Sequence, residues 1–233
     1  MVEDNLKDEW ERSYSNADNF VFYPHEEIIR FVSKYIRKRV GLQQFKDVAD
    51  GAHYSRVLDL GCGIGRHVMF CHDMGLEAYG VDLSETAIAT FKEWSGIRGI
   101  KGLESQVLAG DARDLPWPDD YFQFAISHGV LDSMKLEVAR STTSELARVM
   151  APGGLFYCDL ISGDDSQHAR EYSGEQIVEG IHEQDTVQLY FNWASIDFLF
   201  KDLFEILEGY LIRREDVVKG GYISRYHLVL RKI

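Results

Sequence analysis

Apolar runs and segments of helical periodicity alternate through the central part of the chain. Short apolar runs predict strands at residues 56–60, 77–81, 105–109, 122–127 and 154–160. Apolar residues at helical spacing predict helices at residues 66–74, 84–94 and 136–150. This alternation is typical of a parallel sheet with helices on both faces. The pattern therefore predicts an α/β fold.

The C-terminal third departs from this alternation. A polar segment at residues 162–185 leads into an apolar and aromatic segment at 187–192 and a short predicted helix at 194–203. Residues 204–212 and 222–231 are predicted strands, and too few residues separate them for a helical crossover. We therefore expect the mostly parallel sheet to end in an antiparallel hairpin.

The N-terminal part contains a basic cluster. Apolar spacing predicts one helix at residues 27–39, followed by a loop at 41–55. The helix carries the cluster, which consists of Lys34, Arg37, Lys38 and Arg39. Such a cluster indicates a solvated helix face, and a nucleic-acid patch is the less favoured alternative.

The composition adds a strong negative charge. The net charge of −13 repels a phosphate backbone, which makes a nucleic-acid partner less favoured than a small molecule. The sequence shows no signal peptide, no apolar run long enough for a membrane helix, and no cysteine spacing typical of a metal site or a disulfide framework. We expect a single cytoplasmic domain over residues 1–233, without metal or membrane, and leave its oligomeric state open.

A glycine-rich turn follows the first predicted strand. The segment Val57-Leu58-Asp59-Leu60-Gly61-Cys62-Gly63-Ile64-Gly65 runs from a buried strand into the start of a helix. Glycines allow the backbone to bend sharply and a ligand to approach closely. The amides at the start of the helix suit a carboxylate or a phosphate. In the dinucleotide fingerprint a third glycine would stand where this chain has Arg66, which disfavours a nicotinamide or flavin enzyme.

Two aspartates end the next two predicted strands. Asp82 lies beside the glycine turn, where its carboxylate can accept hydrogen bonds from both hydroxyls of an adenosine ribose. Asp111 follows the third strand and could accept a hydrogen bond from the amino group of adenine. Either aspartate alone would suit a loop or a helix cap. Their succession after a glycine turn indicates a nucleoside site.

These segments together resemble the class I S-adenosylmethionine-dependent methyltransferases, and most closely the small-molecule group described as methyltransferase type 11. The resemblance covers residues 56–160 and includes Leu115-Pro116-Trp117-Pro118-Asp119 and the segments 126–131 and 146–154. It implies a Rossmann-like sheet of seven strands, mostly parallel with the last antiparallel, and helices on both faces. It also implies an enzyme that uses S-adenosylmethionine as its cofactor.

The resemblance further implies roles for individual residues. Gly61 and Gly63, with Cys62 between them, would border the methionine end of the cofactor, Asp82 would hold the ribose, and Leu83 would pack on adenine. The adenine edge would be recognised by Asp111 and Ala112, while Ser127 and His128 would line the pocket near the sulfonium.

His128 is the first candidate for a general base, and a histidine that only shapes the pocket is the alternative. Relatives fold their N-terminal region over the cofactor, so residues 1–45 are expected to form a helical lid with Tyr14 and Tyr23 as candidate pocket residues. Packing of the first helix on the core would explain the same aromatic residues.

The segment 162–200 is variable in such enzymes and often builds the acceptor site. His168 and His182 are candidates there, although surface histidines are the more common case. Asp132 departs from the histidine or glutamate often found at this position, which leaves a catalytic role for its loop in doubt.

We therefore expect methyl transfer to the oxygen or nitrogen of a small molecule by in-line displacement. One alternative is a protein that binds S-adenosylmethionine or its demethylated product without catalysis, such as a partner subunit. A less favoured one is an NAD(P)-dependent oxidoreductase. An RNA or protein acceptor stays open.

Overall fold

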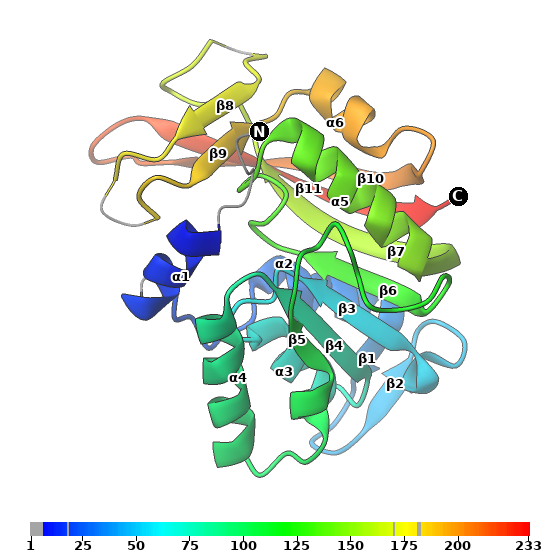
Figure 1. Cartoon of the computed structure of the whole chain (residues 1–233). Helices are drawn as coiled ribbons and strands as arrows, with labels where there is room; N and C mark the ends of the chain where they lie inside the picture. Colours follow the sequence, from blue (N-terminus) through cyan, green and yellow to red (C-terminus); the bar gives the residue numbers. More distant parts are fainter. Residues whose placement is uncertain (1–6, 18, 170, 181–182) are drawn as a thin grey trace.

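Seven strands form the central sheet of the computed structural model, which describes residues 7–17, 19–169, 171–180 and 183–233 (Figure 1). Their order across the sheet is β10-β11-β7-β6-β3-β4-β5. The strands are β3 (Arg56–Leu60), β4 (Glu77–Asp82), β5 (Val107–Ala109), β6 (Phe122–Ser127), β7 (Met150–Ile161), β10 (Phe204–Glu215) and β11 (Tyr222–Lys232). β11 runs antiparallel to both of its neighbours, β10 and β7, whereas the pairs β7–β6, β6–β3, β3–β4 and β4–β5 are parallel. The predicted mostly parallel sheet with an antiparallel last strand is therefore confirmed.

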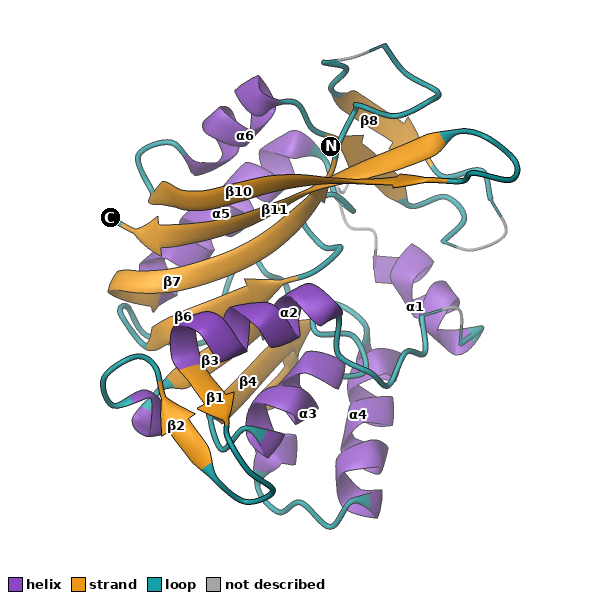
Figure 2. Cartoon of the chain, turned by 180° about the vertical axis from the view of Figure 1, so that it is seen from behind, coloured by secondary structure: helices purple, strands orange, loops and turns teal. Residues whose placement is uncertain are grey.

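Helices cover both faces of this sheet, as predicted. One face is covered by α5 (Leu136–Val149) and α6 (Trp193–Phe200), and the other by α2 (Glu26–Phe31), α3 (Arg66–Asp73) and α4 (Glu85–Ile97) (Figures 1 and 2). Since both faces are buried, the inner strands are almost continuously apolar rather than alternating. The start of α4 is capped by Ser84, whose hydroxyl accepts a hydrogen bond from the Ala87 amide at 3.1 Å.

The predicted helix at residues 27–39 is wrong at its C-terminal end. After α2, a π-helical turn at Val32–Ile36 leads into a short strand, β1 (Arg37–Arg39), which pairs antiparallel with β2 (Phe45–Asp47) inside the expected loop. The Arg37 guanidinium donates a hydrogen bond to the Met74 carbonyl at 3.0 Å and lies 3.0 Å from the Asp47 carboxylate. These tertiary contacts favour the extended conformation, so the basic cluster does not share one helix face.

The C-terminal part adds a second layer above one end of the sheet. The polar segment contains β8 (Gly174–Ile177), which pairs with β9 (Val187–Tyr190) in a separate two-stranded sheet. The β10–β11 hairpin extends past the core toward this pair (Figure 2). No helix in the described ranges is long and apolar enough to cross a bilayer.

The parallel strands end at one edge of the sheet, and this edge carries the polar residues of interest. Pairing of β3 with β4 and β6 brings the glycine turn, Asp82 and Ser127 to the same edge. A short N-terminal helix, α1 (Lys7–Ser15), lies at this edge and contacts α4 (Figure 1). Ligands of open α/β sheets bind at such carboxyl ends.

Candidate active site

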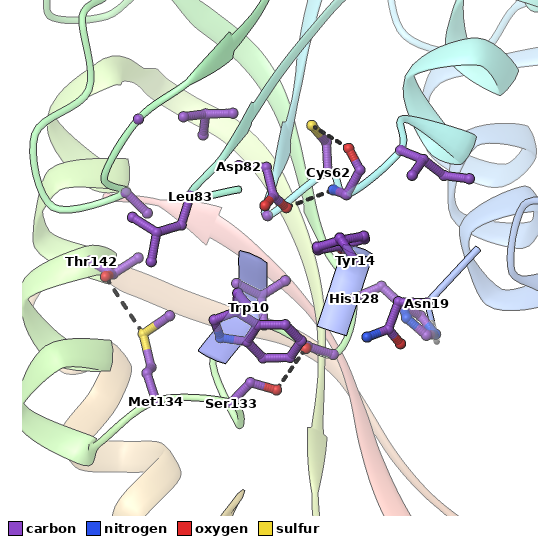
Figure 3. A pocket seen from close by; sticks show the side chains of 18 of the residues that line it. Trp10, Tyr14, Asn19, Cys62, Asp82, Leu83, His128, Ser133, Met134 and Thr142 are labelled. Atoms are coloured by element: carbon purple, nitrogen blue, oxygen red, sulfur yellow. Dashed lines mark hydrogen bonds between the residues drawn. The ribbon is translucent and has the colours of Figure 1, made fainter. Parts of the chain in front are cut away.

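A cavity of about 320 Å³ opens at the carboxyl ends of the central strands. Its wall combines the glycine turn, the ends of β4 and β5, the loop after β6, and Trp10 and Tyr14 from α1 (Figure 3). Most residues predicted for the site line it, namely Tyr14, Gly61, Cys62, Gly63, Asp82, Leu83, Asp111, Ala112 and His128.

Three other candidates lie elsewhere. Ser127 is buried in β6 behind the cavity, and its hydroxyl has no hydrogen-bond partner among the described residues. Tyr23 is 81% exposed at the surface. The His168 ring stacks on Tyr172 and pairs with Asp165 at 2.9 Å, because these groups pack together beside the β8–β9 pair. The structure does not bring these side chains to the cavity, and His182 lies outside the described residues.

The glycine turn requires residues without a side chain. Gly61 and Gly63 have φ values of +67° and +53°, a region that other residues rarely adopt. A Cβ on Gly61 would overlap the Val130 side chain, and one on Gly63 would lie 2.5 Å from the Tyr14 hydroxyl. A residue larger than glycine at either position would therefore clash with the neighbouring side chain and strain the backbone.

Asp82 is held rigidly at the end of β4. One carboxylate oxygen accepts a hydrogen bond from the Gly63 amide at 2.7 Å (Figure 3), and the other accepts one from the Ser84 amide at 3.0 Å. Burial raises the pKa of Asp82 to about 6, although the hydrogen bonds from the two amides lower it. The group is therefore ionised at neutral pH. A fixed carboxylate that faces the cavity can accept further hydrogen bonds from hydroxyl groups of a ligand.

The carboxylate of Asp111 is paired within its own loop. Arg113 contacts it through its guanidinium at 2.6 Å and through its backbone amide at 2.9 Å. The hydrogen bond from Arg113 holds the pKa of Asp111 below its usual range, despite partial burial. Both side chains line the cavity beyond Leu83, so this end presents a fixed acceptor beside a cation.

His128 lies in a cluster of partly buried side chains. Its Nδ1 is 3.2 Å from the Arg66 guanidinium, its Nε2 is 3.6 Å from the Asp159 carboxylate, and its ring centroid is 4.2 Å from that of His25. Burial lowers the pKa of His128 to about 3, although Asp159 opposes this shift. Since Arg66 can only donate, the contact favours the neutral tautomer with its hydrogen on Nε2.

The loop after β6 rests on a buried ion cluster. The Arg225 guanidinium on β11 lies 2.6 Å from the Asp132 carboxylate and 2.7 Å from that of Asp159. Asp132 also accepts a hydrogen bond from the Ile161 amide, and Asp159 accepts one from the Gly129 amide, both at 2.8 Å. Asp132 is thus a structural acid under the loop and does not line the cavity.

Polar contacts hold α1 over the cavity. The Glu11 carboxylate accepts hydrogen bonds from the amides of Glu85 and Thr86 and from the Ser84 hydroxyl, all at the start of α4. Although partial burial opposes ionisation, these bonds hold the pKa of Glu11 below its ordinary value. On the other side, Arg12 lies 3.3 Å from the Asp185 carboxylate.

Replacing Glu11 with alanine should loosen the attachment of α1. A carboxylate at a helix N-terminus contributes about 1–2 kcal/mol, so local opening of α1 should become about 5- to 30-fold more frequent. Amide hydrogen exchange of residues 7–15 would measure it, with Asp8→Ala on the exposed side of α1 as the control. Equal exchange rates in both variants would show that Glu11 does not hold the helix.

Several cavity residues were not singled out from the sequence. They are Asn19, Val21, His67, Ser133, Met134, Val138, Thr142 and Glu183, whereas Arg66 was noted only as a missing glycine. His67 directly follows the glycine turn, and Val138 and Thr142 are spaced i, i+4 on α5. The position of His67 and the spacing of Val138 and Thr142 could therefore have identified these three residues from the sequence.

The chain resembles known proteins over this same region. The model of a family described as a methyltransferase domain matches residues 58–158. A methyltransferase of Synechocystis without assigned substrate is 30% identical over 171 residues, which cover 72% of this chain and 73% of that protein. The chain belongs to the class I S-adenosylmethionine-dependent methyltransferases. Family membership confirms the resemblance inferred from the sequence and identifies S-adenosylmethionine as the cofactor.

More distant methyltransferases extend the likeness. The chicken tRNA N(3)-cytidine methyltransferase METTL2 is 23% identical over 209 residues, which cover 85% of this chain but only 56% of that protein. Among solved structures, the 1,6-didemethyltoxoflavin-N1-methyltransferase of Burkholderia thailandensis superposes with a TM-score of 0.70 at 16% identity, covering 97% of this chain and 87% of that one. At this identity the likeness supports the fold alone.

The residues of the cavity fit the family's cofactor. The glycine turn leaves room where a Cβ would collide, Asp82 offers an ionised acceptor, and Leu83, Ala112 and Val138 supply apolar contacts. A nucleoside joined to a zwitterionic amino acid needs this combination of apolar and charged walls.

Proposed function

We propose that the chain transfers the methyl group of S-adenosylmethionine to an oxygen or nitrogen of a small-molecule acceptor by in-line displacement. The observation that carries this proposal is the cavity itself, in which a glycine turn and a buried carboxylate meet under an aromatic helix. S-adenosylmethionine supplies a methyl group already activated by a positively charged sulfur. The protein therefore mainly has to bind, align and exclude water.

We assign the cofactor contacts by combining the family pattern with the lining of the cavity. Asp82 would accept hydrogen bonds from the ribose hydroxyls, and Leu83 would pack on adenine. Asp111 and Ala112 would contact the adenine edge, while Gly61, Cys62 and Gly63 would border the methionine end. Trp10 and Tyr14 would exclude water from above, which supports α1, but not the whole range 1–45, as a lid.

We propose that His128 positions the acceptor and does not remove its proton. Burial holds its pKa at about 3, and both ring nitrogens already face charged partners, Arg66 and Asp159. In nuclear magnetic resonance the His128 ring should therefore stay neutral from pH 8 down to pH 4.5. The His128→Asn variant identifies its signals. A titration midpoint near 6.5 would restore the general-base assignment.

The charge of the chain and the size of the cavity indicate the class of acceptor. A net charge of −13 and a cavity of about 320 Å³ support a small molecule over an anionic polymer. The likeness to a tRNA methyltransferase over 85% of this chain supports tRNA as the second candidate. Neither candidate acceptor depends on whether the segment 162–200 builds the acceptor site.

Calorimetric titration with S-adenosylhomocysteine, with NAD as the control, tests the cofactor assignment. Micromolar binding of the first ligand and none of the second is expected. Labelled S-adenosylmethionine, offered with a panel of small amines, phenols and carboxylates or with tRNA, then tests the acceptor. Label in tRNA alone would favour the second candidate, and binding without turnover on any acceptor would favour a non-catalytic subunit.

A cytoplasmic location belongs to the same proposal. Cys62, Cys71 and Cys158 are buried free thiols, and burial raises the pKa of each. Such thiols suit a reducing compartment.

A further inference from the structure

Strand β10 is an uncovered edge of the central sheet. In the part of the chain that the structure describes, β10 pairs with β11 and with no other strand, and Figure 2 shows it at the outer border of the sheet. Every residue from Gly209 to Glu215 is exposed. One side of the strand therefore presents backbone amides and carbonyls that no neighbouring strand of the described chain satisfies.

Apolar side chains lie on both faces of this edge. Since neighbouring residues of a strand point to opposite faces, Tyr210 and Ile212 share one face and Leu211 lies on the other. All three side chains are about half exposed. Trp193 of α6 is also half exposed, and its ring lies 6.5 Å from that of Tyr226, the residue opposite Leu211 on β11. A strip of apolar side chains therefore faces solvent along β10.

The edge carries little of the protection that native sheets usually have. Exposed edge strands are commonly short, interrupted by a bulge or a proline, or covered by a helix or loop. A bulge does interrupt β10 between Ile206 and Glu208, but the register with β11 is regular from Glu208 to Glu215, and this segment contains no proline. The segment is thus suited to pairing with a further strand.

The charge of this segment favours a second copy of the same chain. A net charge of −13 makes two copies repel each other over most of their surfaces. The segment from residue 208 to 215 is neutral, because Glu208 and Glu215 balance Arg213 and Arg214. Two copies can therefore meet along β10 with little repulsion.

Two-fold symmetry restricts how two such strands can pair. Directly opposed residues of an antiparallel pair point to the same face, so an axis perpendicular to the sheet must lie at a residue that faces its own copy. With the axis at Leu211, Tyr210 of one copy lies opposite Ile212 of the other. Glu208 then lies opposite Arg214, on the same face of the sheet. This register pairs apolar with apolar side chains and opposite charges with each other.

Neighbouring registers are less favourable. An axis at Ile212 would place Glu208 opposite Asp216, which are like charges. An axis at Tyr210 would place Glu208 opposite Ile212 and would oppose Arg214 to a residue before the bulge. The charges therefore select the axis at Leu211 among these three registers.

We propose that two copies of this chain pair antiparallel along β10, with the two-fold axis at Leu211, and form one continuous sheet across a homodimer. The Glu208 carboxylate is held in place by Lys34 at 2.5 Å and can bind Arg214 of the other copy as well. Arg213 lies opposite Gly209, which has no side chain to obstruct it. This interface is independent of the cofactor and acceptor assignments.

Sedimentation equilibrium of the full chain at micromolar concentrations tests the dimer, and a particle of twice the chain mass is expected. Leu211→Arg places two cations at the axis and should weaken association at least about 100-fold. Ile97→Arg, at the exposed end of α4 away from β10, is the control and should change it less than about 2-fold (Figure 1). A monomeric unmodified chain, or equal losses in both variants, would overturn the proposal.

Two charge variants test the register without altering the apolar contacts. Arg214→Glu and Glu208→Lys each oppose like charges in their own homodimer, so each should weaken association about 10-fold. Mixing the two variants restores opposite charges at both positions. The mixture should therefore form heterodimers with an affinity close to that of the unmodified chain. No gain on mixing would contradict the pairing of Glu208 with Arg214 and overturn the axis at Leu211.

Discussion

Replacing Arg225 with methionine should lower the free energy of unfolding at pH 7.5 by about 3–5 kcal/mol. Arg225 lies between Asp132 and Asp159, whose side chains are 2% and 0% exposed. Methionine fills a similar volume but leaves two buried carboxylates facing each other without a cation. Urea unfolding followed by circular dichroism would measure the change.

The control for this variant lies on the same strand. Arg231 on β11 pairs with Glu205 at 2.5 Å, but both side chains are about half exposed, so Arg231→Met should cost less than about 1 kcal/mol. Similar losses in the two variants would mean that methionine on β11, rather than the buried charge, is responsible.

The loss in Arg225→Met should also depend on pH. Arg225 holds the pKa of Asp159 below its ordinary value against burial, so this group stabilises the native chain above its unfolded pKa and less at lower pH. Burial already raises the pKa of Asp132 to about 6 with Arg225 present, and without Arg225 the pKa values of Asp132 and Asp159 both lie above their unfolded values. The folded variant then binds more protons than the unfolded one, and its stability falls as pH rises from about 4 to 7. The difference between the two proteins should therefore shrink toward pH 4.5.

Replacing Asp82 with alanine should weaken S-adenosylhomocysteine about 100- to 1000-fold, because two hydrogen bonds to a charged acceptor are lost. The variant also frees the Gly63 amide that helps to shape the turn. Calorimetry would measure the loss, with Asp114→Ala, an exposed acid of a nearby loop outside the cavity lining, as the control. A loss below 10-fold would contradict the ribose assignment.

The same carboxylate predicts a pH dependence of binding. The pKa of Asp82 is raised to about 6, so the ionised form, which would accept hydrogen bonds from both ribose hydroxyls, becomes populated as pH rises through 6. Affinity should rise between pH 5 and pH 7. Stability changes in the other direction, because the folded chain holds this proton more tightly than the unfolded chain, so ionising Asp82 destabilises the unliganded fold.

Local patterns predicted the sheet well. The strands β3 and β6 have the predicted bounds, and β11 was expected to be antiparallel because too few residues separate it from β10. Glycines and acids at strand ends predicted one wall of the cavity for the same reason: these residues follow their strands directly. The expected helix at residues 27–39 failed where the pairing of β1 with β2 outweighed local spacing.

Contacts between distant segments could not be predicted. Arg225 and Asp132 are 93 residues apart, and Glu11 reaches a helix start about 74 positions away. The rings of His25 and His128 meet only after β6 and α2 are packed. No spacing rule links such pairs, because the fold alone brings them together.

The contacts of Glu11, Lys7 and Arg12 that attach α1 bear on the rate of catalytic turnover. These contacts are mainly hydrogen bonds and ion pairs between partly exposed groups, and α1 contributes only a few apolar side chains to the core. If α1 acts as the proposed lid, each turnover must break these contacts before the demethylated product leaves. Where such opening is slower than the chemistry, release limits the rate, and dissolved salt accelerates it by screening the charges.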